Sequence, residues 1–232
     1  MLVRIRYKES PYFRITNISV IGSFNNYEAE QGIMQREAGG WFIDVSLNPG
    51  NYIYKFLING EVQLTDPLSN IYETDNAGNV WSVIIIDDED QRLYDNNQYE
   101  LTLDEYLLSG KIVAVEEQTA VSKKQFNLSL DEKIVARFGF PNVTGLHEVT
   151  LFWFMPDGTL YSYAQNSLFQ EYEKTPIYLW FWISLYEIKV EGFEGVWTIK
   201  LFVDGNYVLE DQMTINSGVI YQRYGSYYDI KA

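Results

Sequence analysis

The sequence LNPGNYIYKFLING, residues 47–60, holds one strand between two turns. Asn48-Pro49-Gly50 favours a turn because proline fixes φ and glycine tolerates positive φ. Asn59-Gly60 is a dipeptide that two-residue hairpins prefer. Between them, apolar side chains recur at every second position from Tyr52 to Ile58, the spacing of a strand with one buried face. The stretch therefore predicts a hairpin strand with an aromatic core face and with Lys55 on the opposite face.

Short strand patterns and turn signals continue on both sides of this stretch. They cover residues 1–86, and they resume from Lys111 with turns at Pro156-Asp157-Gly158 and Asp204-Gly205-Asn206. Short strands at this spacing, without intervening helices, are typical of sandwiches. The sequence thus predicts an all-β protein of two β-sandwich domains of immunoglobulin-like (early-set) type, covering residues 1–86 and 111–232.

An acidic linker is expected between the two domains, over residues 87–110. It opens with Asp87-Asp88-Glu89-Asp90, a charged run that should be solvated. Thr102-Leu103-Asp104-Glu105 has the spacing of a capping box and Gly110 is a stop signal, so one short helix is expected there. At the end of the second domain, residues 217–232 form a Tyr-rich tail that has neither a clear strand pattern nor a clear helix pattern.

The strand predicted at residues 177–186 is apolar on both faces, and the strand at residues 147–155 repeats the pattern. One face of the first strand carries an aromatic set: Tyr178, Trp180, Trp182 and Tyr186. A sandwich strand normally turns its outer face to water, so something should cover this one. Three candidates are open: another part of this chain, a partner protein or second copy in a homodimer, or a sugar. Trp and Tyr are favoured at interface centres.

The composition excludes several kinds of chemistry. The chain has no Cys, so thiol catalysis and Cys-ligated metals are absent. A Ser-His-Asp arrangement or a His-metal site would have to use His147, which follows a turn where a surface histidine is expected. We find no phosphate-binding glycine loop and no calcium-loop spacing. We therefore expect that the protein is not an enzyme and that it has no catalytic residues, no metal site and no cofactor. A glycosidase with two facing carboxylates is a hypothesis that ranks far behind a binding or a scaffold function.

The charge and hydropathy also narrow the partners and the location. The formal charge is −15, from 17 basic and 32 acidic residues, so nucleic acid and anionic membranes are unfavourable partners. No apolar run approaches the roughly 18 residues that a membrane helix needs. Met1 leads into an alternating strand pattern rather than a signal peptide. A cytoplasmic protein is expected.

The first domain contains several motifs in a recognisable order. They are GSFNNY (22–27), GW (40–41), PGNYIYKF (49–56), NG (59–60), DP (66–67) and GNV (78–80). Together they resemble the glycogen-binding domain of the AMP-activated protein kinase β subunit and the related family-48 carbohydrate-binding modules, over about residues 15–86. The resemblance implies an α-glucan bound on an aromatic platform, with polar groups fixing its hydroxyls.

The resemblance also assigns candidate binding residues. Tyr27 stands where these domains usually place the first stacking Trp, and Lys55 matches their sugar-contacting lysine. Asn79 and Trp81 occupy the usual binding segment of the last strand. Val62 stands where the second stacking Trp is usual, so this chain departs from the family pattern there. Trp81 either supplies the missing ring or is buried.

Two functions of different classes follow. The first is a non-catalytic module or adaptor that binds an α-glucan or oligosaccharide, which predicts Tyr27, Lys55 and Trp81 exposed on one surface. The alternative is a structural or regulatory scaffold, or a homodimer, that keeps the fold and has lost sugar binding. It predicts that Trp81 is buried and that Tyr178, Trp180 and Trp182 lie at an interface.

Overall fold

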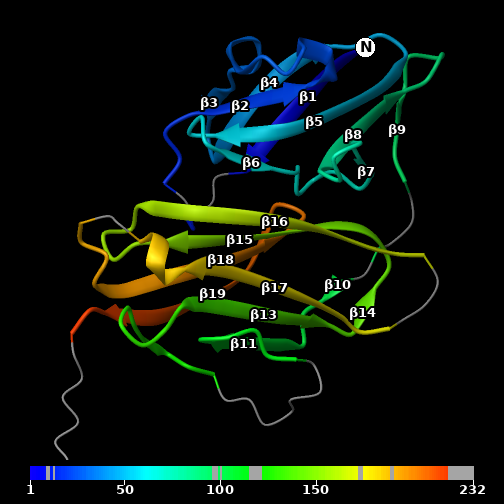
Figure 1. Ribbon diagram of the computed structural model, residues 1–232. Helices are drawn as coiled ribbons and strands as arrows, with labels where there is room; N and C mark the ends of the chain where they lie inside the picture. The colour runs from blue at the N-terminus through cyan, green and yellow to red at the C-terminus, as the bar shows by residue number, and fades with distance from the viewer. Residues whose placement is uncertain are drawn as a thin grey trace, which may run out of the picture.

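The computed structural model describes residues 1–8, 11–12, 14–95, 99, 101–114, 122–171, 175–188 and 191–218. These residues form strands, short 3-10 helices and turns, arranged as two β-sandwiches that pack against each other (Figure 1). The all-β architecture expected from the sequence is confirmed. Most of the Tyr-rich tail, residues 219–232, lies outside the described residues. No helix within the described ranges is long and apolar enough to cross a membrane.

The first sandwich consists of a three-stranded and a six-stranded sheet. The smaller sheet has the order β1-β4-β3, with bounds Leu2–Lys8, Gly40–Ser46 and Gln35–Glu37. The larger sheet has the order β2-β5-β8-β7, with β6 paired to β5 and β9 paired to β8. Its strands are β2 Ile18–Gly22, β5 Gly50–Ile58, β6 Val62–Leu64, β7 Tyr72–Thr74, β8 Val80–Ile86 and β9 Arg92–Leu93. The 3-10 helices η1 (Ser23–Asn25) and η2 (Ala29–Gly32) follow β2.

Alternating apolar residues place the core of the first sandwich between these sheets. β1 buries every second residue, ending with Tyr7. β5 turns Tyr54, Phe56 and Ile58 inward, and all three are fully buried, as the sequence predicts. The rings of Tyr7 and Phe56 meet edge to face with 4.9 Å between centroids, so they join the two sheets at the centre of the core.

The second sandwich pairs a three-stranded sheet, β11-β13-β17, with a five-stranded sheet, β12-β19-β18-β15-β16. The smaller sheet contains β11 Glu105–Ser109, β13 Lys133–Phe140 and β17 Ile177–Ser184, and η3 (Leu185–Glu187) follows β17. The larger contains β12 Gln125–Asn127, β15 Gly145–Phe154, β16 Leu160–Gln170, β18 Gly195–Val203 and β19 Asn206–Asn216. β10 (Leu101–Thr102) and β14 (Asn142–Val143) form a separate pair. Trp153 and Trp197 are buried in the core of this sandwich.

The prediction of a short helix between Thr102 and Gly110 is wrong. The segment forms β10 and β11 instead, and β11 pairs with β13 along its whole length. Tyr106 and Leu108 face the core, where Tyr106 stacks on Phe138 with 5.2 Å between ring centroids. A helix this short has little stability of its own. Pairing with β13 satisfies the backbone of both strands, and this tertiary contact outweighs the local capping pattern.

The region predicted as a linker, residues 87–110, is attached to both sandwiches. β9 pairs with β8 of the first sandwich, whereas β10 and β11 pair with strands of the second. Asp87 closes the acidic turn, because its Oδ1 accepts hydrogen bonds from the N–H groups of Glu89 and Gln91. The division of the chain at residues 86 and 110 stays a prediction.

The outer face of the five-stranded sheet packs on the first sandwich, with β15 and β16 nearest to it in Figure 1. Along β15, Leu151 and Trp153 point into the core of the second sandwich. Phe152 and Phe154 point the other way and join the core of the first sandwich, together with Phe202 of β18. Burying each of these Phe side chains contributes roughly 2 kcal/mol. The strand is apolar on both faces because each face belongs to a different core.

The turn Asp204-Gly205 between β18 and β19 touches the first sandwich through its backbone. Both residues have positive φ, 50° and 73°, as the predicted hairpin turn requires. A Cβ atom on Gly205 would lie 2.3 Å from the carbonyl oxygen of Thr65 in the first sandwich. The two backbones therefore approach too closely here for any side chain.

We expect Gly205→Ala to be more destabilising than Gly158→Ala. Both glycines have positive φ, but a Cβ on Gly158 would meet no atom within 4 Å. Gly158→Ala should thus cost only the backbone strain, about 1 kcal/mol. Gly205→Ala should add roughly 1–3 kcal/mol for the collision with Thr65. Urea unfolding of the two variants measures the difference, and equal losses would contradict this description of the contact.

Candidate functional site

Tyr27 lies on a tightly bonded loop that follows β2. The Asn25 side chain fixes the loop, because its Oδ1 accepts a hydrogen bond from the Gly22 N–H at 2.9 Å and its Nδ2 donates to the Val20 carbonyl at 2.8 Å. The Tyr27 N–H donates to the Gly22 carbonyl at 2.9 Å. Tyr27 has a φ of 61°, uncommon for an aromatic residue, and is 46% exposed. The loop thus holds an aromatic ring at the surface.

Trp81 and Asn79 are held by one carboxylate that the sequence analysis missed, Asp75. Its Oδ2 accepts hydrogen bonds from Asn79 Nδ2 at 2.8 Å and from Trp81 Nε1 at 3.0 Å. Its Oδ1 accepts from the N–H groups of Ala77 and Asn79. The side-chain hydrogen bond from Asn79, followed by that from Trp81, holds the pKa of Asp75 well below its usual range. The recognisable signal was an Asp at the start of the turn Asp75–Asn79, since Asp often accepts N–H groups two residues on.

The structure brings Tyr27 and Trp81 together. Their rings meet edge to face, with 5.4 Å between centroids and 69° between planes. Trp81 is half-buried, and the buried Lys55 Nζ lies 5.6 Å from its ring centroid. The two rings therefore form a corner at the surface, which we call the Tyr27–Trp81 corner, rather than a flat platform.

The expectation that Lys55 is exposed is wrong. Lys55 is 1% exposed, and its Nζ donates at 2.6 Å to Oε1 of Glu148, a 2% exposed residue of β15. Gln165 Oε1 of β16 lies 3.5 Å from the same Nζ. The outer side of β5 is covered here by the second sandwich, and a buried ammonium group needs a counter-charge. The lysine that the family resemblance assigns to a sugar hydroxyl instead joins the two sandwiches.

Val62 explains why the second stacking ring is missing. It lies on β6, is buried in the core of the first sandwich, and pairs with Ile58 of β5. The neighbouring Glu61 carbonyl accepts a hydrogen bond at 3.3 Å from Tyr163 OH of the second sandwich. The position after the Asn59-Gly60 hairpin therefore faces the fold, and it presents no ring to solvent.

The aromatic face of β17 is partly covered by the segment before residue 115. Trp180 Nε1 donates to the Val113 carbonyl at 3.2 Å, and Val113 is buried. The Arg137 guanidinium lies 5.8 Å from the ring centroid of Tyr178. Trp182 is 56% exposed and Tyr186 is 68% exposed. Part of this face is thus covered by the chain itself, and part of it faces solvent.

The expectation that His147 lies at the surface is also wrong. It is buried in β15, with Nδ1 hydrogen-bonded to Asp204 Oδ2 at 2.6 Å and Nε2 to the Thr144 carbonyl at 2.9 Å. Burial lowers the pKa of His147, but the hydrogen bond and charge of Asp204 outweigh it, and the net shift is upward. Since both ring nitrogens are occupied within the fold, His147 has no free nitrogen for a substrate or metal.

The described part of the chain contains no group of three or more His, Cys, Asp or Glu residues that is able to hold a metal ion. Its conspicuous surface features are aromatic rings beside fixed polar groups. Such an arrangement is suited to a neutral ligand with an apolar face, as a sugar ring has.

Comparison with known proteins finds a family match in the first part of the chain. Residues 7–92 match the family described as "Glycogen recognition site of AMP-activated protein kinase". This match supports a carbohydrate-binding module in the first part of the chain and confirms the resemblance found in its motifs. No curated protein matches the chain.

Two solved structures are similar at low sequence identity. An immunoglobulin-like protein from Pseudomonas aeruginosa is 15% identical with a TM-score of 0.35, covering 50% of this chain and 97% of its own. The alkylpurine DNA glycosylase AlkC of Pseudomonas fluorescens, bound to DNA containing an abasic site analog, is 10% identical with a TM-score of 0.32. That match covers 52% of this chain and 32% of the glycosylase. Neither likeness supports a statement about function.

Removing one partner of the Lys55–Glu148 pair should be strongly destabilising. Glu148→Ala leaves the Lys55 ammonium buried without a counter-charge, so we expect a loss of about 3–5 kcal/mol in the free energy of unfolding. Replacing both residues with apolar ones, Lys55→Met with Glu148→Leu, should recover most of this loss. Urea unfolding of Lys55→Met, of Glu148→Leu and of the double variant measures the coupling.

The exposed pair Arg4–Asp44 supplies the matched control for this cycle. Asp44→Ala should change stability much less than Glu148→Ala, since solvent screens an exposed pair. A double variant as unstable as Glu148→Ala would contradict the assignment of the loss to the unpaired charge.

Because of His147, the single histidine of the chain, the free energy of unfolding should fall as the pH rises. Because the pKa of His147 is raised in the folded state, its contribution is full below the ordinary pKa and is lost as pH rises through the folded value. His147→Gln should flatten this part of the profile from about pH 6.5 upward. Denaturant unfolding of both proteins across this range checks it, and identical slopes would exclude the Asp204 contact as the cause.

Proposed function

We propose that this protein is a non-catalytic binding protein or adaptor that holds an α-glucan chain at the Tyr27–Trp81 corner. The observation that carries the proposal is the edge-to-face pair of Tyr27 and Trp81 within residues 7–92, which match the glycogen-recognition family. An aromatic ring at the surface offers its face to the apolar face of a pyranose ring. A second ring set at 69° to the first gives the bound sugar a side wall.

Polar groups beside the corner support a neutral ligand. The Asp75 carboxylate fixes Trp81 and Asn79 in place, so the indole orientation is set before a ligand arrives. The adjacent cation, Lys55, is already neutralised by Glu148 and does not call for an anionic ligand. A preorganised ring costs little entropy on binding. With so few contacts we expect a weak site, with a Kd on the order of a millimolar for a short glucan.

The state of the polar groups supports a role without catalysis. The two nitrogens of His147 are occupied by Asp204 and Thr144. The carboxylate nearest to the corner, Asp75, accepts four hydrogen bonds from its own turn and from Trp81. Groups held in this way position side chains rather than exchange protons with a substrate.

The burial of Lys55 and Val62 favours a second candidate function. If the rings of the corner do not bind a sugar, the chain is a scaffold or homodimer that keeps the fold and uses its exposed aromatic side chains, Trp182 and Tyr186, for a protein contact. Sedimentation of the intact protein distinguishes the two proposals, because the scaffold form predicts self-association and Trp182→Ala should abolish it.

Titration with maltoheptaose, in which calorimetry measures the heat of binding, tests the α-glucan proposal. Tyr27→Ala should weaken binding about tenfold, as loss of a stacking ring costs on the order of 1 kcal/mol or more. Tyr27→Ala with Trp81→Ala should abolish measurable binding. Tyr186→Ala removes a ring of the second sandwich that is more exposed than Tyr27 (68% against 46%), and it should leave the affinity unchanged. No heat with the wild-type protein at millimolar sugar would overturn the proposal, and a loss confined to Tyr186→Ala would move the site to the second sandwich.

A further inference from the structure

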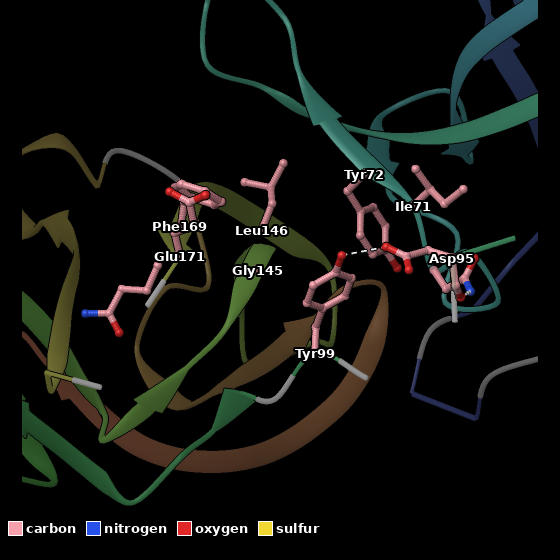
Figure 2. A pocket seen from close by; sticks show the side chains of 10 residues that line it. Ile71, Tyr72, Asp95, Tyr99, Gly145, Leu146, Phe169 and Glu171 are labelled. Carbon is pink, nitrogen blue, oxygen red and sulfur yellow. Dashed lines mark hydrogen bonds between the residues drawn. The ribbon is translucent and has the colours of Figure 1, made fainter. Parts of the chain in front are cut away.

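A cavity of about 300 Å³ lies at the junction of the two sandwiches. Three parts of the chain line it: the segment before β7, the segment before β10, and the paired ends of β15 and β16. We call it the junction pocket, and its lining residues are Asn70, Ile71, Tyr72, Asp95, Tyr99, Gly145, Leu146, Phe169, Gln170 and Glu171. Figure 2 shows Leu146 and Phe169 on one side and Tyr72, Tyr99 and Asp95 on the other.

One wall of the junction pocket is preorganised by Tyr99 and Asp95. Tyr99 OH donates a hydrogen bond to Asp95 Oδ2 at 2.5 Å, and Asn70 Nδ2 donates to the Asp95 carbonyl. A Cβ atom on Gly145 would lie 2.3 Å from Cδ1 of the Tyr99 ring. The ring therefore rests directly on the backbone of Gly145, whose φ of +83° also favours glycine.

The opposite wall offers an apolar ring to solvent. Phe169 is 62% exposed, although the preceding residue of β16, Leu168, is buried in the core. Leu146 lies beside it, paired across β15 and β16. An exposed Phe beside an aliphatic side chain, facing a fixed tyrosine across a cavity, is the arrangement of a small-molecule pocket, which typically combines apolar walls with a few polar groups.

The charges of the lining limit the ligand to a neutral or cationic one. The pocket has no Lys, Arg or His among its lining residues, so phosphates, sulfates and carboxylates have no counter-charge there. Asp95 already accepts the Tyr99 hydroxyl, and Glu171 is exposed to water. Neither carboxylate is thus a buried, unpaired group of the kind that compensates the desolvation of an ammonium ion. The chemistry that remains is a neutral molecule with hydroxyl donors and an apolar face.

We propose that the junction pocket binds a neutral monosaccharide or disaccharide, with one ring packed on Phe169 and hydroxyl groups donating to Asp95, Gln170 or Glu171. The volume lies at the small end of the range for small-molecule sites, which suits one or two sugar rings. This site is separate from the Tyr27–Trp81 corner and does not rest on it. Because both sandwiches contribute walls, the pocket exists only while they are docked.

Saturation-transfer NMR on the intact chain tests the proposal with glucose, maltose, cellobiose and lactose as probes. Every protein in this experiment also carries Tyr27→Ala and Trp81→Ala, so that any sugar it binds is bound outside the Tyr27–Trp81 corner. We expect at least one of these sugars to bind, and Phe169→Ala to weaken it about tenfold. Phe169→Tyr keeps the ring and should keep the affinity, and Tyr186→Ala, an exposed ring outside the pocket, should have no effect.

Three results would overturn the proposal: no sugar bound at about 20 mM, binding that survives Phe169→Ala, or choline binding in place of every sugar. The Phe169 variants should fold, because the side chain is exposed, and circular dichroism checks that they do. Since the background already lacks the corner, failure of the α-glucan proposal leaves this result unaffected.

Discussion

The contact between the two sandwiches, which buries the ion pair of Lys55 and Glu148, is the feature on which the rest of the structure depends. The lysine comes from the first sandwich and the glutamate from the second, and both are almost completely removed from solvent. Burial raises the pKa of Glu148, and the charge of Lys55 opposes this shift. Neither charged group is stable in its place without the other, because an isolated buried charge is expensive. The pair therefore lies where the sandwiches meet, and Phe152, Phe154 and Phe202 form the apolar part of the same contact.

This contact decides which surfaces are left for a ligand. It occupies the lysine that a glycogen-recognition domain is expected to offer to a sugar, and the residue after the neighbouring hairpin, Val62, faces inward. Of the residues that the resemblance assigns to sugar binding, Tyr27, Asn79 and the half-buried Trp81 remain at the surface. The docking of the two sandwiches also forms the junction pocket, because residues of both sandwiches line it. The same interface thus covers one side of the first sandwich and forms the walls of the junction pocket.

The excess of acidic residues has a structural role in many of the described turns. Asp75, Asp87, Asp157 and Asp204 each accept backbone N–H groups with their carboxylates. Asp204 also binds His147, so one side chain orders two residues of β15. Buried Asp66 accepts a hydrogen bond from Tyr54 OH, and burial raises its pKa. A carboxylate is a strong acceptor for N–H groups that no strand pairs, and this is how an acidic chain with short strands closes its turns.

Features that depend on neighbours along the chain were predictable from the sequence. The alternation in β5 placed Tyr54, Phe56 and Ile58 in a core, and the dipeptides Asn59-Gly60 and Asp204-Gly205 formed the positive-φ turns that they favour. The motifs of the first sandwich were sufficient to recognise its resemblance to the family whose model matches residues 7–92. Tertiary structure decided the rest: whether residues 105–109 pair with β13, whether Lys55 and His147 meet a partner or water, and which rings share a surface. Each of these outcomes depends on a group far away in the chain, and a local pattern records the periodicity of a strand but not the identity of what covers it.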